Sequence, residues 1–84
     1  MTLLLWVDGE RGALARILLV AERRGFRPTH VVATPLAPDD GFLLQLGVEG
    51  TRDPGMLQRM LARLHDVRRV LHEPEPVSAA ATRR

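Results

Sequence analysis

The spacing of apolar residues in the first third of the chain predicts a strand followed by a helix. Residues 3–7 form a short apolar run that ends at the turn-forming residues 8–10, which is typical of a central strand buried on both faces. Between residues 12 and 25, apolar residues recur at the spacing of one helix face, and a glycine stands at the end. The stripe of this amphipathic helix consists of Leu14, Ile17, Leu18 and Ala21.

The middle of the chain carries the pattern of a β-hairpin. Residues 29–34 are rich in β-branched residues and lie between Pro28 and Pro35, which cannot donate to a sheet ladder and therefore favour an edge strand. Residues 35–41 have the composition of a turn, and from residue 42 to residue 49 apolar side chains alternate with their neighbours. A hairpin therefore joins the second and third predicted strands.

The last third repeats the order of helix and strand. Asp53 is a suitable N-cap and Pro54 fits the first helical position, where its missing N–H has no cost. A final strand is expected over residues 67–72, with Val67 and Arg69 on one face and Arg68 and Val70 on the other. The apolar stripe of the second helix consists of Leu57, Met60, Leu61 and Leu64.

The order of elements predicts an α+β fold of the ferredoxin-like type, a βαββαβ plait. With right-handed crossovers, four strands form one antiparallel sheet that carries both helices on one face. Residues 1–72 are expected to form this single domain, and residues 73–84 a flexible C-terminal tail. A chain of 84 residues has room for one small core, so association with a partner is expected.

The amino-acid composition bears on disulfides, metal binding, cellular location and nucleic-acid binding. The chain contains no cysteine, and His30, His65 and His72 show no paired spacing, so we expect no disulfide and no metal site. The apolar start is too short for export or for crossing a membrane, which predicts a cytoplasmic protein. All twelve basic residues are arginine, so the high pI reflects permanently charged side chains and does not itself indicate nucleic acid.

Several uses of this fold are disfavoured by the residues present. An RNA-binding plait needs exposed aromatic residues on its central strands, whereas this chain has only Trp6, Phe26 and Phe42. We interpret Trp6 as a core or interface residue. A metal carrier needs a Cys-x-x-Cys loop, which is absent. The candidate acid–base groups show no spacing that indicates cooperation, so no catalytic residue and no cofactor are predicted. These groups are Asp8, Glu10, His30 and His65.

The loop before the first helix is the main candidate for ligand binding. Gly9 and Gly12 flank Glu10 and Arg11 directly before the helix N-terminus, where unpaired backbone N–H groups can hold a carboxylate. Gly12 has a second explanation, because glycine at this position also permits close packing or an unusual turn.

Two segments resemble a known family. The sequence VDGERGALARI at residues 7–17 is similar to the start of ACT domains, in which Gly-x-Leu-x-Arg-Ile opens the first helix. The sequence RRGF at residues 23–26 resembles the small regulatory subunit of acetolactate synthase, and the likeness extends over residues 3–72. The chain resembles the short subunits that have an ACT domain and little else.

This resemblance implies a non-catalytic regulatory subunit in branched-chain amino-acid biosynthesis. Such a subunit binds the catalytic large subunit, which holds thiamine diphosphate, and forms a homodimer through an edge strand. An effector amino acid such as valine is implied between the first loop of one chain and the second strand of the other. The implied effector-binding residues are Asp8, Arg11, Gly12, Ala13 and Arg27, and the implied dimer interface is Thr29, His30, Val31, Val32, Ala33 and Thr34.

Two other functions remain open at this point. One is a stand-alone ACT amino-acid sensor that acts on another enzyme, and the other is a small ferredoxin-like enzyme. Four arginines on the predicted helices are candidates for docking on an acidic catalytic subunit, although exposed helix charges are commonly only solvated. They are Arg16, Arg23, Arg59 and Arg63.

Overall fold

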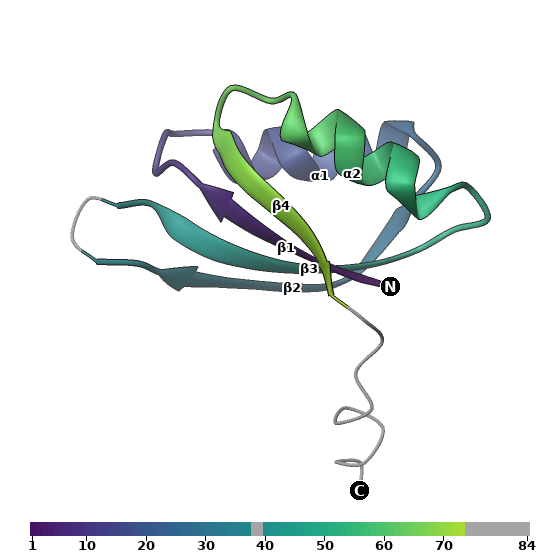
Figure 1. Ribbon diagram of the computed structural model, residues 1–84, viewed down its shortest axis with the longest axis horizontal. Coiled ribbons are helices and arrows are strands. Elements are labelled where there is room, and N and C mark those ends of the chain that lie inside the picture. The colour runs from purple at the N-terminus through teal and green to yellow at the C-terminus, as the bar shows by residue number, and fades with distance from the viewer. Residues whose placement is uncertain (38–39, 74–84) are drawn as a thin grey trace, which may run out of the picture.

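The chain folds into a βαββαβ plait, as the sequence predicts (Figure 1). The computed structural model describes residues 1–37 and 40–73. The four strands form one antiparallel sheet in the order β2-β3-β1-β4. The elements are β1 (Thr2–Val7), α1 (Ala13–Arg23), β2 (Arg27–Pro35), β3 (Phe42–Glu49), α2 (Pro54–Ala62) and β4 (Val67–Glu73).

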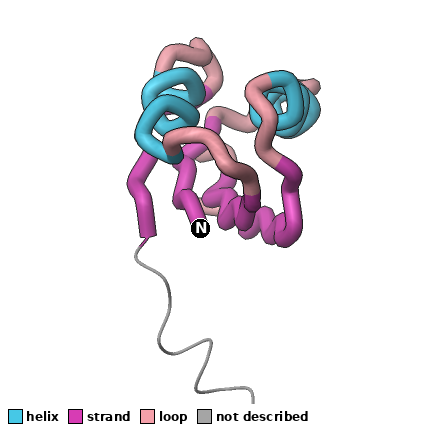
Figure 2. Tube along the Cα trace, turned by 90° about the vertical axis from the view of Figure 1, so that its right-hand side faces the viewer, coloured by secondary structure: helices cyan, strands magenta, loops and turns pink. Residues whose placement is uncertain are grey.

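The core lies between the sheet and the two helices, which cover the same face of the sheet (Figure 2). The helices bury the expected stripes only in part: Ile17 and Ala21 are fully buried in α1, and Leu57 and Leu61 in α2, while the other members are half-buried. The sheet contributes every second residue of its two central strands, namely Leu3, Leu5, Val7, Leu44, Leu46 and Val48.

The expectation that β1 is buried on both faces is wrong. Its residues alternate between buried and half-buried, because no segment within residues 1–37 and 40–73 covers the face of the sheet away from the helices. Trp6 lies on this open face and is half-buried, so it is not a core residue. The guanidinium of Arg69 lies 5.4 Å from the centroid of the Trp6 ring, which is a cation–π arrangement.

The two helices begin in different ways. At α2, the side chain of Asp53 accepts a hydrogen bond of 2.9 Å from the backbone N–H of Gly55, and Pro54 occupies the first helical position, as predicted. At α1, the N-cap is Gly12 with φ of 84°, and no side chain caps the helix. This left-handed backbone is one that glycine adopts readily, so Gly12 has a clear conformational role.

Strand β2 is longer than predicted and lies at one edge of the sheet, so the edge position is confirmed. It includes Pro28 and Pro35, because an edge strand tolerates residues that cannot donate toward a second neighbour. Its register with β3 shifts between Pro28 and His30, and this irregularity leaves Thr29 without a pairing partner in β3.

The predicted alternation of β4 is wrong at its start. Val67 and Val70 are both buried, although three residues separate them along the chain. The reason is a register shift against β1: Val7 pairs with Val67, and Trp6 pairs with Arg69, so Arg68 is an extra residue in the strand. Glu73, which the sequence assigned to the tail, is the last residue of β4, and residues 74–84 lie outside the described part.

Three loops meet at the end of the sheet where β1 ends. Pro38 and Asp39, part of the predicted turn, lie outside the described residues, while Leu36 closes this loop by donating a 3.0 Å hydrogen bond to the carbonyl of Gly41. A side chain at Gly41 would collide with the carbonyl oxygen of Val7.

Neither helix in the described part of the chain has the length and apolar character needed to cross a membrane.

Candidate functional site

The predicted ligand-binding loop lies at the end of the sheet where Val7 pairs with both Phe42 and Val67. Pro35 of β2 also pairs with Phe42, so the end of β2 reaches the same level. As a result, three loop segments are neighbours at one end of the domain, namely residues 8–12, the described loop residues 36–37 and 40–41, and residues 63–66 (Figure 1). We refer to this region as the loop end of the sheet.

The start of α1 offers unpaired donors at the loop end. The N–H of Ala13 is used by the carbonyl of Glu10, and the N–H of Arg16 by the carbonyl of Gly12. The N–H groups of Leu14 and Ala15 donate no hydrogen bond to any described residue. Together with the positive end of the helix dipole, these donors favour a carboxylate or another anion.

Asp8 is half-buried beside this helix start and is held by the extra residue of β4. Its Oδ1 lies 3.0 Å from Nε of Arg68, and its backbone N–H donates a 2.8 Å hydrogen bond to the carbonyl of Asp66. Arg68 also donates to the carbonyl of Asp40 in the β2–β3 loop. The bulge in β4 therefore places one guanidinium where it connects the β1–α1 loop to the β2–β3 loop.

A second charged cluster lies on the same side and is centred on Asp66, which is buried with only 1% of its side chain exposed. Nε and Nη2 of Arg16 both donate to its Oδ2, with 2.8 Å for Nε. The pKa of Asp66 lies below its ordinary value, mainly because of its interaction with the nearby side chain of Glu10. Burial opposes this shift, and the positive charges of Arg16 and His65 reinforce it.

The other implied effector residues have different surroundings. Arg11 is exposed and forms no ion pair with a residue in the described ranges. Ala13 is buried in the core, so only its backbone faces the loop. Arg27 is exposed and its Nη2 lies 2.6 Å from Oε1 of Glu49.

Arg27 lies far from the loop end within one chain. It pairs with Glu49 at the opposite end of the sheet, beyond Thr2, whereas Pro35 lies level with Val7. Eight residue steps of about 3.3 Å put Arg27 roughly 25 Å from that level. A single chain therefore does not bring the five implied effector residues together, and their role stays a prediction.

The implied interface residues lie on the free edge of β2. Thr29 to Thr34 are all exposed, and no described strand pairs with this side of β2. Val31 is level with the buried Leu46 and therefore faces the helix side, whereas Val32 is level with Gln45 and faces the open side. Both valines are among the few large apolar side chains that are exposed, together with Leu19 and Leu71.

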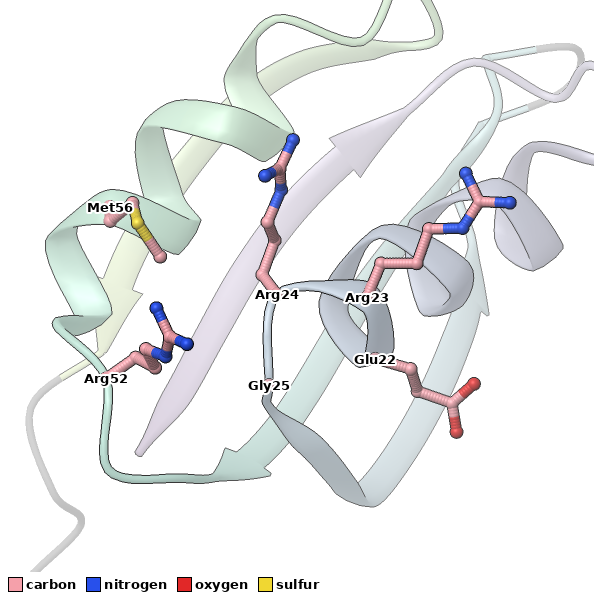
Figure 3. Close-up of a pocket in the computed structure, with 6 residues that line it drawn as sticks. All are labelled: Glu22, Arg23, Arg24, Gly25, Arg52 and Met56. Carbon is pink, nitrogen blue, oxygen red and sulfur yellow. The ribbon is translucent and has the colours of Figure 1, made fainter.

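The outer surface of the helices carries a groove between α1 and α2 that is lined by arginines. One hollow of about 430 Å³ has Val20, Met60 and Leu64 as its apolar lining. Arg23, Arg24 and Arg63 complete its lining. An adjoining hollow of about 310 Å³ adds Glu22, Gly25, Arg52 and Met56, and in Figure 3 the carboxylate of Glu22 points away from Arg52 and Met56. Arg23 and Arg63 were predicted as docking residues, whereas Arg16 instead pairs with Asp66, and Arg59 lies outside the groove.

Sequence reasoning missed Asp66, Arg68, Arg24 and Arg52. Asp66 and Arg68 could have been found from the predicted topology. In a βαββαβ plait the first and last strands are antiparallel neighbours, so the end of the first strand lies beside the start of the last. Residues 65–68 then belong beside the first loop. The sequence RRGF gave a similar hint for Arg24, which follows directly after α1.

Comparison with known families matches residues 9–70 to the ACT domain. A comparison with curated proteins found no match. ACT domains are in general regulatory and non-catalytic, and they commonly bind amino acids and dimerise. The match covers most of the chain and agrees with the observed βαββαβ sheet, so the chain belongs to the ACT domain family.

Proposed function

We propose that this protein is the non-catalytic regulatory subunit of an acetolactate synthase, that it acts as a homodimer, and that it binds an effector amino acid such as valine. The observation that carries the proposal is the division of the implied effector residues between the two ends of the sheet, which a dimer of β2 strands would reunite. The assignment to acetolactate synthase is supported by the sequences at residues 7–17 and 23–26.

The free edge of β2 supports the dimer. An exposed apolar edge strand tends to pair with another strand, and a twofold axis lets the same strand of a second copy serve as its partner. Pairing would cover Val31 on one face and Val32 on the other. Leu19 is a further exposed apolar side chain, and it lies on α1, the helix that packs against β2.

Antiparallel pairing of β2 with its own copy fixes where Arg27 goes. With the twofold axis near Val31, Arg27 of the second copy lies beside Pro35 of the first. Pro35 is level with Val7, so the second copy's Arg27 arrives at the loop end. Each dimer then contains two equivalent sites, each built from the first loop of one copy and the strand start of the other.

The chemistry of such a site fits a zwitterionic amino acid. The unpaired N–H groups of Leu14 and Ala15 and the guanidinium of the second copy's Arg27 would bind the carboxylate of the effector. The carboxylate of Asp8 would attract its ammonium group. Gly12 brings the backbone into the left-handed turn that opens the helix start to the ligand.

The arginine-lined groove supports docking on an enzyme subunit. Arg23, Arg24, Arg52 and Arg63 form no ion pair within the part of the chain that the structure describes, and they border an apolar floor. An acidic amphipathic segment matches this combination, because its apolar face would fill the hollow and its carboxylates would meet the rim. We assign this segment to the catalytic subunit.

The proposal has a direct test in two parts. Isothermal titration of the full chain with valine, leucine and isoleucine, and with lysine as an unrelated control, is expected to show binding of at least one branched-chain amino acid. Co-purification with the catalytic subunit of acetolactate synthase from the same source is expected to give a stable complex with raised synthase activity. Absence of a complex would contradict the proposal, and effector binding without a complex would instead favour an ACT sensor for another enzyme.

The docking face is tested by charge reversal. Arg24→Glu and Arg63→Glu are each expected to weaken the complex by about tenfold or more, because each places a like charge against an acidic segment. Arg59→Glu is the matched control, since Arg59 is an exposed arginine of α2 outside the groove. Equal losses in all three variants would show that the groove is not the docking site.

A further inference from the structure

Three side chains at the loop end converge on one point, although they come from two different loops. Glu10 belongs to the β1–α1 loop, and His65 and Asp66 belong to the turn between α2 and β4. Nε2 of His65 lies 2.8 Å from Oδ1 of Asp66 and 3.3 Å from Oε1 of Glu10. One ligand atom from each residue lies within 4.8 Å of the other two.

The buried carboxylate of Asp66 is only half satisfied. Its Oδ2 accepts both hydrogen bonds from Arg16, while its Oδ1 is buried and accepts no hydrogen bond from a described residue. Nε2 of His65 is close to this oxygen but does not meet it with the alignment of a hydrogen bond. A buried acceptor without a donor is unfavourable, and it points toward the space shared with Glu10 and His65.

We propose that Glu10, His65 and Asp66 form a binding site for a divalent transition-metal cation such as Zn²⁺. An imidazole nitrogen and two carboxylate oxygens are suitable ligands for zinc, and three protein ligands leave one position open. Around a tetrahedral Zn²⁺ with bonds of about 2.1 Å, ligand atoms lie about 3.4 Å apart. The separations of 2.8 and 3.3 Å are near that value, so small side-chain movements bring the ligands into place.

The net charge of the cluster favours binding of a cation and limits the expected affinity. Two ionised carboxylates and the guanidinium of Arg16 leave one net negative charge when His65 is neutral. A divalent cation is therefore attracted, but Arg16 weakens the attraction. We expect a site that binds and releases its metal, in contrast to the closed zinc sites that some small domains need for folding.

A bound cation would connect two parts of the domain. Glu10 stands two residues before Gly12, whereas His65 and Asp66 precede β4. Metal binding would fasten the β1–α1 loop to the α2–β4 turn. Because this argument uses only residues of one chain, it holds independently of the effector and the enzyme proposed above.

The site is tested on the untagged full chain after removal of metal with a chelator. Isothermal titration with Zn²⁺ and Mn²⁺ is expected to show one ion bound per chain for at least one of them, with a rise in Tm on binding. Glu10→Gln and His65→Gln are each expected to lower the affinity by about tenfold or more. Both side chains are exposed, so the variants should fold, which circular dichroism verifies.

Matched controls separate this site from unspecific metal binding. Glu22→Gln and His72→Gln remove an exposed glutamate and an exposed histidine outside the cluster and are expected to leave the affinity unchanged. Failure of the wild-type protein to bind either ion would overturn the proposal and leave a simple ion-pair cluster. Equal affinities of the wild type and both cluster variants would also overturn it, because the metal would then lie elsewhere.

Discussion

The two edge strands of the sheet differ in the charges that surround their unpaired backbone. In β4, four of the seven residues are charged or titratable, namely Arg68, Arg69, His72 and Glu73. In β2, His30 is the single titratable residue between Thr29 and Thr34. The apolar residues Val32 and Leu71 are nevertheless equally exposed, at 37% each.

This difference indicates which edge strand is available to pair with a second copy of the chain. Charged side chains and a bulge are common means of protecting an edge strand from pairing, and β4 has both. Strand β2 has its own register shift between Pro28 and His30, but from His30 to Pro35 its pairing with β3 is regular, and it presents Val31 on one face and Val32 on the other. Val32 and Leu71 are equally exposed, but in the proposed dimer only the β2 edge pairs with a second copy, while the charges of β4 protect the other edge.

The largest expected effect comes from a charge on the apolar edge. Val32→Asp is expected to convert the dimer to a monomer, because pairing would bury the carboxylate against its own copy. Light scattering at several protein concentrations measures the change. Leu71→Asp, an equally exposed site on the other edge, is expected to leave the dimer intact. A dimeric Val32→Asp variant, or dissociation in both variants, would contradict the assignment of the two edges.

A smaller effect, on effector affinity, is expected from changing Arg27, which the proposed dimer would bring to the loop end of the second copy. Arg27→Gln should weaken effector binding by about tenfold, which corresponds to one charge-assisted hydrogen bond, without changing the oligomeric state. Titration with the effector measures the loss. Glu49→Gln removes the ion-pair partner but retains Arg27, so it is expected to preserve affinity. Matching losses in the two variants would assign the effect to the ion pair.

The smallest effect is expected on the protected edge. Arg69→Gln removes the cation over Trp6 and is expected to lower the free energy of unfolding by about 0.5–1 kcal/mol. Urea unfolding followed by fluorescence measures this directly, because Trp6 is the single tryptophan of the chain. Arg11→Gln, an exposed arginine without an ion pair among the described residues, is the control. No difference between them would show that Arg69 does not stabilise the strand.

Local sequence signals predicted the elements well, but not their detailed register. Asp53 and Pro54 mark the start of α2 because capping depends on neighbours in the sequence. The burial of Val70 was mispredicted because the bulge at Arg68 depends on how β4 pairs with β1. The open face beside Trp6 was likewise missed, since an apolar run does not reveal how many layers cover it.

The candidate sites were even harder to predict from local sequence, because they depend on how the strands pair. The loop around Gly12 was identified because its residues are contiguous and its glycine has a local conformational reason. The cluster of Glu10, His65 and Asp66 was missed because its members come from loops that are joined only through the pairing of β1 with β4. The charge of Arg27 was noticed, but its distance from Gly12 follows only from the strand register.

The separation of Arg27 from the first loop has a genetic consequence in the proposed dimer. Consider two inactive alleles, one altered at Gly12 and the other at Arg27. A mixed dimer of these chains would contain one site with both defects and one site with neither, since the intact loop of one chain meets the intact arginine of the other. Cells that carry both alleles would therefore regain about half of the effector sites in every mixed dimer, although neither allele alone provides any.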